Sequence, residues 1–119
     1  MSEEILERLR RLDACAVSDA LDRLGFDGAV SGIVPRSLAK RIAGRVRTVS
    51  LGPAEGKTAP RHLCTAAIEA AEAGEVIVIE QRTGIEAAGW GGILSIGAAA
   101  KGMVTAFLSE RSSVLDPAG

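Results

Sequence analysis

The residues with the clearest potential for chemistry form a glycine-rich turn, Gly89-Trp90-Gly91-Gly92-Ile93-Leu94. This turn follows a buried-type strand pattern and comes where a helix is expected to begin. Amides in the first turn of a helix have no intrahelical acceptor, and the helix dipole adds partial positive charge there. Such amides bind a carboxylate or phosphate without a basic side chain, and glycines let the anion approach closely. The amides from Gly91 to Leu94 are therefore candidate anion-binding groups.

These glycines also have a structural interpretation, which the spacing alone favours. Glycine permits a tight turn and close packing, whether or not a ligand binds. The pattern is not a dinucleotide-binding fingerprint, because its third glycine and the ribose-binding acid are absent. No P-loop Gly-Lys-Ser/Thr and no Gly-x-Ser-x-Gly elbow occurs in the sequence.

Other polar residues are expected to have structural or solvated roles. His62, the only histidine, lies beside an expected helix start, and no orienting partner for a general base is readable. Asp19 and Asp22 share a helix face, and a solvated ion pair with Arg23 explains them better than paired catalytic carboxylates.

Five basic residues occur without an intervening acid: Arg36, Lys40, Arg41, Arg45 and Arg47. This stretch could contact phosphate or an acidic protein surface. Arg45 and Arg47 alternate as solvent-facing strand positions would, which favours a solvated face.

Composition limits the classes of function. The chain has 119 residues, of which 47% are hydrophobic and 24% charged, and its formal net charge is -1. One ordinary soluble domain is expected. Without surplus positive charge, nucleic acid is not expected as a partner, and the scarcity of aromatic residues gives bases little to stack on.

Two cysteines and the first residues bear on the compartment. Cys15 and Cys64 have no metal-ligand spacing, so no zinc site is readable and reduced thiols in the cytoplasm are expected. The acidic start Met-Ser-Glu-Glu is unlike a signal peptide, and no long apolar run predicts a membrane span.

The pattern predicts alternating helices and strands. Helices are expected over 3–11 and 14–24, the second capped by Asp13 and ended by Gly25. A strand over about 43–51 precedes a helix with Thr58 or Ala59 as cap and Pro60 in its first turn.

The second half predicts a βαβ unit. The helix that starts near Pro60 should run through Ala73 and end at Gly74. A strand over 76–79, a helix over 92–101 and a strand over 103–108 follow, and residues 109–119 have no periodicity.

Five segments in one order resemble a known family: Cys15-Ala16-Val17-Ser18-Asp19-Ala20-Leu21-Asp22, Ile42-Ala43-Gly44-Arg45-Val46-Arg47-Thr48-Val49, Ala73-Gly74-Glu75-Val76-Ile77-Val78-Ile79, Trp90-Gly91-Gly92-Ile93-Leu94 and Lys101-Gly102. The family is that of the regulator of ribonuclease activity A and the class II 4-hydroxy-4-methyl-2-oxoglutarate aldolases. The resemblance runs from about Leu9 to Leu108.

The resemblance implies both a fold and an activity. The fold is α/β, a β/β/α swivelling-domain-like domain over 1–108 with an N-terminal helical hairpin, followed by an irregular tail over 109–119. The aldolase branch cleaves 4-hydroxy-4-methyl-2-oxoglutarate-type 2-oxo acids, or decarboxylates oxaloacetate, to pyruvate with a divalent cation such as Mg²⁺. Assembly as a homo-oligomer, a trimer or hexamer, is implied, with substrate held at Gly91, Gly92, Ile93 and Leu94.

One family motif is absent, an Asp-Gly-x-x-Arg-Asp run that grips substrate and anchors the metal. In the family's spacing its arginine and final aspartate fall on Ser113 and Val114, while Arg111 and Asp116 lie in the wrong order. No catalytic residue or metal ligand is therefore assigned, and the C-terminal strands of the family fold are expected to be missing. The alternative function is a non-catalytic regulator that masks a ribonuclease or another partner.

Overall fold

The computed structural model describes residues 2–29, 31, 40–81 and 89–105. The chain divides into two compact units, Met1–Gly44 and Arg45–Gly119. The assignment of residues 1–108 to one domain stays a prediction.

The first unit contains the two expected helices, α1 (Glu3–Arg10) and α2 (Ala14–Leu24). Asp13 caps α2, because its Oδ1 accepts the amide of Ala16 at 2.7 Å. Gly25 ends α2 in the left-handed conformation, with φ of 76°. The sequence signals at both ends of α2 are confirmed.

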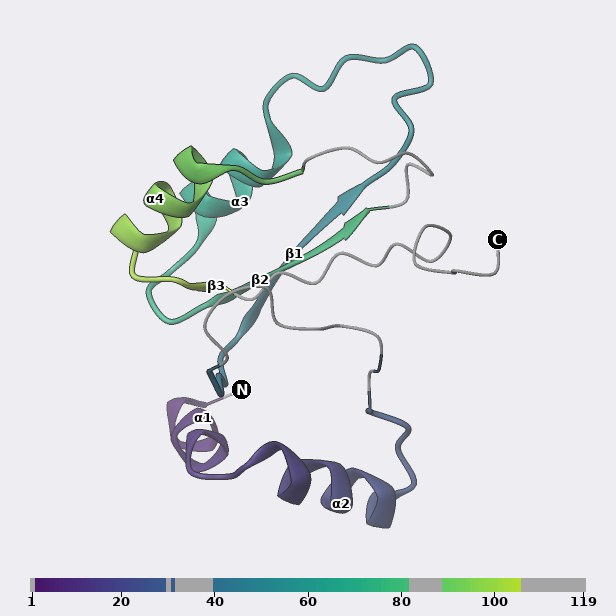
Figure 1. The fold of residues 1–119 in the computed structure, drawn as a ribbon, viewed down its shortest axis with the longest axis vertical. Coiled ribbons are helices and arrows are strands. Elements are labelled where there is room, and N and C mark those ends of the chain that lie inside the picture. The colour runs from purple at the N-terminus through teal and green to yellow at the C-terminus, as the bar shows by residue number, and fades with distance from the viewer. Residues whose placement is uncertain (1, 30, 32–39, 82–88, 106–119) are drawn as a thin grey trace. The chain divides into compact units, whose positions relative to one another are not determined.

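The second unit is a parallel α/β structure (Figure 1). Its strands are β1 (Val46–Leu51), β2 (Val76–Gln81) and β3 (Val104–Thr105), in the spatial order β1-β2-β3. Helix α3 (Leu63–Ala70) connects the first two strands and α4 (Gly92–Ala100) the last two. The predicted βαβ unit is confirmed, while residues 106–108 of the expected last strand and the tail 109–119 lie outside the described residues.

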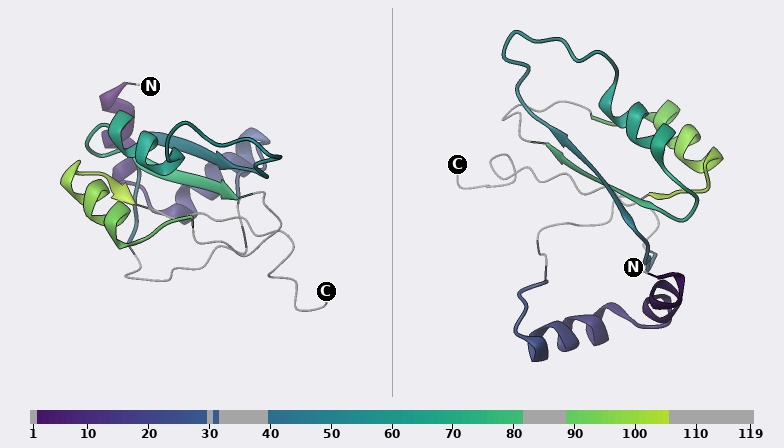
Figure 2. Two further views of the ribbon diagram at one scale, coloured as in Figure 1. Left: turned by 90° about the horizontal axis from the view of Figure 1, so that it is seen from above. Right: turned by 180° about the vertical axis from the view of Figure 1, so that it is seen from behind.

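The core of this unit lies between the sheet and the two helices, which lie side by side (Figures 1 and 2). Val49 pairs with Ile79 in the parallel register, so both side chains share a face with Ile77. The buried cluster consists of Val49, Ile77 and Ile79 from this face, Cys64, Ala67, Ile68 and Ala98 from the helices, and Ala71 and Met103, which follow α3 and α4. Small helix side chains let α3 and α4 lie close to the sheet.

The predicted bounds of α3 are wrong at both ends. The helix begins at Leu63, and its cap is His62 rather than Thr58 or Ala59, because the His62 ring accepts the amide of Thr65 at 3.3 Å. Pro60 therefore lies before the helix. The helix ends at Ala70, where the next residue turns to extended backbone with ψ of 153°. Gly74, with φ of 83°, belongs to the turn before β2.

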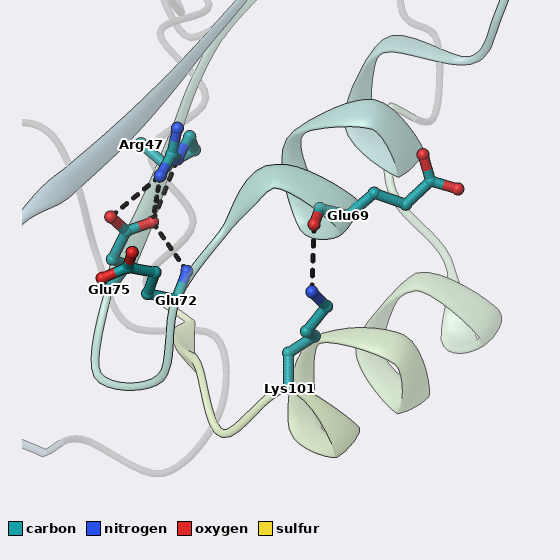
Figure 3. Close-up of polar contacts among 5 residues, drawn as sticks. All are labelled: Arg47, Glu69, Glu72, Glu75 and Lys101. Atoms are coloured by element: carbon teal, nitrogen blue, oxygen red, sulfur yellow. Dashed lines mark hydrogen bonds and ion pairs between the residues drawn. The ribbon is translucent and has the colours of Figure 1, made fainter.

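The expectation that Arg47 faces solvent is also wrong. Arg47 lies on the same face of β1 as Val49, two residues along, and that face is covered by the helices. Its guanidinium donates to both carboxylate oxygens of Glu75 at 2.8–3.0 Å (Figure 3). Glu75 also accepts the amide of Glu72 at 3.2 Å. This bidentate ion pair fixes the turn between α3 and β2 against the start of β1.

A second polar contact joins the far ends of the two helices. Lys101, directly after α4, donates from Nζ to the main-chain oxygen of Glu69 in the last turn of α3, at 2.9 Å (Figure 3). A cation at this end also complements the dipole of α3. Because the helices end together here, at the amino ends of the strands, both begin at the opposite, carboxyl edge of the sheet.

Candidate functional site

The turn before α4 lies at the carboxyl edge of the sheet. Leu51 and Gln81 are the last residues of β1 and β2. A Cβ added at Gly89 would lie 3.1 Å from Cδ1 of Leu51 and 3.5 Å from Oε1 of Gln81. The turn therefore lies directly against the ends of two neighbouring parallel strands. Ligands of open α/β sheets bind outside the carboxyl ends of the strands.

The glycines of this turn fall into two kinds. At Gly89 a side chain would press on Leu51, so close packing accounts for that glycine. At Gly91 and Gly92 an added Cβ would meet no atom of the described residues within 4 Å. Gly91 also has φ of -144° and ψ of -177°, extended backbone that any residue adopts. The structural interpretation thus fits Gly89, whereas open space lies in front of Gly91 and Gly92.

The first-turn amides of α4 belong to Gly92, Ile93 and Leu94. Gly91 at the N-cap has no side chain with which to cap them. Gly92 and Ile93 are exposed, the Ile93 residue at 86%, while Leu94 packs on the core. The predicted substrate-binding positions thus lie together at an accessible helix start, with partial positive charge and no charged side chain among them.

Three side chains to which the sequence assigned no such role, those of Cys64, Trp90 and Ser95, hold this turn in place. The Cys64 thiol, in the first turn of α3, donates to the Gly89 carbonyl oxygen at 3.4 Å. The Trp90 indole donates from Nε1 to Oγ of Ser95 at 2.8 Å, and that hydroxyl donates to the Gly91 carbonyl oxygen at 3.3 Å. A serine four residues after a helix cap can donate its hydroxyl to the carbonyl of that cap, so the sequence pattern is compatible with the contact from Ser95 to Gly91. Cys64 and Gly89 are 25 residues apart, and no local pattern connects them.

The Cys64 thiol is a structural donor. Its residue is fully buried, and burial raises the pKa of the thiol by disfavouring the thiolate. A protonated thiol can donate to Gly89, whereas a thiolate could not. Cys64 and Cys15 are both free.

The other residues considered for catalysis cap a helix or lie exposed. His62 has the structural role expected for it, as the cap of α3. Asp19 and Asp22 are exposed on α2, and no ion pair between either of them and Arg23 is formed among the described residues.

The basic stretch does not form one solvated face. Lys40, Arg41 and Arg45 are exposed, while Arg47 is half-buried against Glu75. Arg41 donates to the main-chain oxygen of Arg10, the last residue of α1, at 3.5 Å. Arg36 lies outside the described residues.

The described residues do not fit a metal centre. Within residues 2–29, 31, 40–81 and 89–105, no group of three or more His, Cys, Asp or Glu side chains could hold an ion. The positions that take the place of the family's arginine and aspartate, Ser113 and Val114, lie outside these ranges, as do Arg111 and Asp116. In the same part of the chain, no helix combines the length and apolarity that crossing a bilayer requires.

Comparison with known proteins gives the chain its family. The family model described as RraA-like, Aldolase/RraA, matches residues 14–107. The chain belongs to the RraA-like family. The match begins at α2 and includes β1, β2, α4 and the turn at Gly91 and Gly92. The resemblance inferred from the five ordered segments is confirmed.

A curated relative supports the same family. The chain is 31% identical over 91 residues to Protein DlpA of Legionella pneumophila subsp. pneumophila (strain Philadelphia 1). The aligned region is 76% of this chain but 15% of DlpA, so the chain spans a small part of that relative. No solved structure matches the chain significantly.

Members of the RraA-like family generally depend on a divalent metal, act on small substrates and form homo-oligomers. The observed parallel α/β structure is compatible with the RraA-like fold.

Proposed function

We propose that this RraA-like chain binds the carboxylate of a small 2-oxo acid at the amino end of α4. The observation that carries the proposal is the open space in front of Gly91 and Gly92, where neither packing nor backbone conformation calls for glycine. A carboxylate in that space would accept hydrogen bonds from first-turn amides and lie at the positive end of the helix dipole.

The reaction proposed for this site is pyruvate formation, by aldol cleavage of 4-hydroxy-4-methyl-2-oxoglutarate-type acids or decarboxylation of oxaloacetate. Both reactions leave the negatively charged enolate of pyruvate. The amides of Gly92 and Ile93 would hold the substrate carboxylate and orient the bond that breaks. No step is assigned to a metal, because the described residues offer no ligand set for one.

The proposal includes a fold and an assembly. A β/β/α swivelling-type domain assembled as a homotrimer or hexamer would cover the apolar outer face of α4, where Ile93 and Ile96 are 86% and 72% exposed. A helix without a charged residue from Gly92 to Ala100 is typical of a buried environment.

A second candidate function is the non-catalytic one, in which the chain binds and masks a ribonuclease or another protein. The observation in its favour is that the described residues bring no carboxylate, imidazole or thiol ligand set to the turn at Gly91. A masking protein needs no such set.

Pyruvate release separates the two functions. The purified chain is incubated with oxaloacetate or 4-hydroxy-4-methyl-2-oxoglutarate, with Mg²⁺ or with a chelator, and pyruvate is measured by a coupled assay. The lyase function predicts turnover above a blank of Mg²⁺ alone. If the chain binds oxalate, a small dicarboxylate, but releases no pyruvate, only the carboxylate-binding part of the proposal stands. If the chain neither binds oxalate nor releases pyruvate, the result favours the masking function.

A further inference from the structure

Within the proposed site, the backbone conformation of the Gly91–Gly92 peptide is the least restricted by its own residues. Neither residue has a side chain, and an added Cβ at either position meets no described atom within 4 Å. A peptide between two glycines has the widest choice of backbone conformations. An amide that must face a ligand from such a position needs a restraint supplied by other residues.

The restraint acts through the Gly91 carbonyl. A trans peptide is planar, with its C=O and the following N–H pointing in opposite directions. The Gly91 oxygen accepts the amide of Ser95 at 3.1 Å and the Ser95 hydroxyl at 3.3 Å, both from within α4. With this oxygen held toward the helix, the N–H of Gly92 has to point outward from its amino end.

Trp90 completes the arrangement. Its Nε1 donates to the same Ser95 hydroxyl at 2.8 Å, so that oxygen accepts from the indole while its hydrogen is directed to Gly91. The indole is half-buried and packs on the core, which makes it a firm anchor. A rigid side chain thus orients the hydroxyl, and the hydroxyl orients the peptide.

We infer that Trp90 and Ser95 are positioning residues, which hold the Gly91–Gly92 peptide with the Gly92 amide turned toward an incoming carboxylate. The inference rests on the proposed function for the identity of the ligand. The orientation of the peptide rests on the hydrogen bonds alone. Neither side chain contacts the ligand, and their effect is to reduce the ordering that the amide would otherwise undergo on binding.

The test compares the affinity of the full chain for oxalate, a small planar dicarboxylate, among five forms. Wild type is compared with Ser95→Ala, Ser95→Thr, Trp90→Phe and the double variant Trp90→Phe/Ser95→Ala, using amide chemical-shift titrations. Loss of one neutral hydrogen bond predicts about threefold to tenfold weaker binding for Ser95→Ala. Ser95→Thr keeps the hydroxyl and should bind within about twofold of wild type.

The double variant gives the decisive comparison. If Trp90 positions the peptide through the Ser95 hydroxyl, Trp90→Phe should weaken binding in wild type and add nothing in the Ser95→Ala background. The control is Ser50→Ala, which removes a hydroxyl of β1 that donates to the Glu80 carboxylate at 3.4 Å. The oxalate affinity of this variant should equal that of wild type. Additive losses from Trp90→Phe and Ser95→Ala, or a Ser95→Ala affinity equal to wild type, would overturn the inference.

A readout without ligand separates this inference from the proposed function. The order parameter of the Gly92 amide in the free protein should fall in Ser95→Ala and stay at the wild-type value in Ser50→Ala. If wild type does not bind oxalate, the proposed function fails, and this order parameter alone decides the inference. An unchanged value for Gly92 in Ser95→Ala would refute the positioning role.

Discussion

At the scale of single residues, the amino end of α4 separates a glycine that packing accounts for from two that it does not. Gly89 lies against Leu51, whereas a Cβ added at Gly91 or Gly92 would meet no described atom within 4 Å. Glycine lowers helix stability relative to alanine because it loses more backbone freedom on folding. Gly92 therefore carries a cost in stability that packing does not explain, and the proposed ligand site would account for it.

A Gly92→Ala variant should stabilise the chain and weaken binding together. The added Cβ meets no described atom, so the free energy of unfolding should rise by up to about 1 kcal/mol. The same methyl group occupies the approach of a carboxylate, and oxalate affinity should fall by about tenfold, the equivalent of roughly 1.4 kcal/mol. Denaturant unfolding and an oxalate titration monitored by Trp90, the only tryptophan, measure the two effects.

Gly97→Ala is the matched control in the same helix. Its Cβ would lie 3.8 Å from Cγ2 of Ile68, an ordinary contact remote from the amino end. This variant should gain stability without any change in oxalate affinity. Equal affinity in Gly92→Ala and Gly97→Ala would contradict the access argument.

The ion pair of Arg47 and Glu75 predicts a dependence of stability on pH. Hydrogen bonds from Arg47 hold the pKa of the Glu75 carboxyl below its ordinary value. Because this pKa is lower in the folded chain than in the unfolded chain, the stabilisation is complete above the unfolded value of about 4.3. It is lost as the pH falls through the lower folded pKa.

Glu75→Gln should reduce the free energy of unfolding by about 1–2 kcal/mol at pH 7, because the pair is charge-assisted but Arg47 is partly exposed. Urea unfolding between pH 7 and pH 2 should show a smaller loss of stability with acid in this variant. The control is Glu69→Gln, whose carboxylate pairs with Arg61 on the surface and should contribute little. A steep acid limb retained in Glu75→Gln would assign the pH dependence to other groups.

At the scale of elements, the sequence predicts a helix correctly where nearby residues determine both of its ends. Asp13 and Gly25 bound α2 as expected, because the cap and the left-handed residue act within a few positions. Pro60 is typical of a first helical turn, but α3 begins three residues later, where His62 supplies the cap. The face of Arg47 and the Cys64 contact to Gly89 depend on partners 28 and 25 residues away. No local pattern carries that information.

The His62 cap of α3 predicts a measurable contribution to stability. His62→Ala removes the acceptor for the Thr65 amide and should cost about 0.5–2 kcal/mol of stability. His62→Asn restores an acceptor suited to an N-cap and should recover most of that loss. Thermal unfolding of the three proteins measures the difference. Equal melting temperatures for His62→Ala and His62→Asn would mean that the ring acts by packing rather than by capping.

At the scale of the whole molecule, α4 has two proposed uses. Its amino end offers amides to a ligand, and its outer face presents Ile93 and Ile96 without any charge. Family members generally form homo-oligomers, and an uncharged helix face is the kind of surface that assembly covers. The five ordered segments predicted the family, whereas the partner surface could not be predicted, because exposure emerges only once the elements pack.

Ile96→Glu should shift the assembly toward the monomer. A carboxylate at the centre of an apolar interface would be buried without a partner, at a cost of several kcal/mol. Light scattering during size-exclusion chromatography measures the mass. Thr58→Glu, which adds the same charge in an exposed loop, should keep the mass of wild type. An assembly unchanged by Ile96→Glu would place the interface elsewhere.

The central claim is that first-turn amides of α4 bind the carboxylate of a 2-oxo acid. Its most direct measurement is an amide chemical-shift titration of the isotopically labelled chain with oxalate. The claim predicts saturable downfield shifts of the Gly92, Ile93 and Leu94 amides, with little change in β1 or at the far end of α4. Saturation with no shift at these three amides, or no saturation at all, would contradict it.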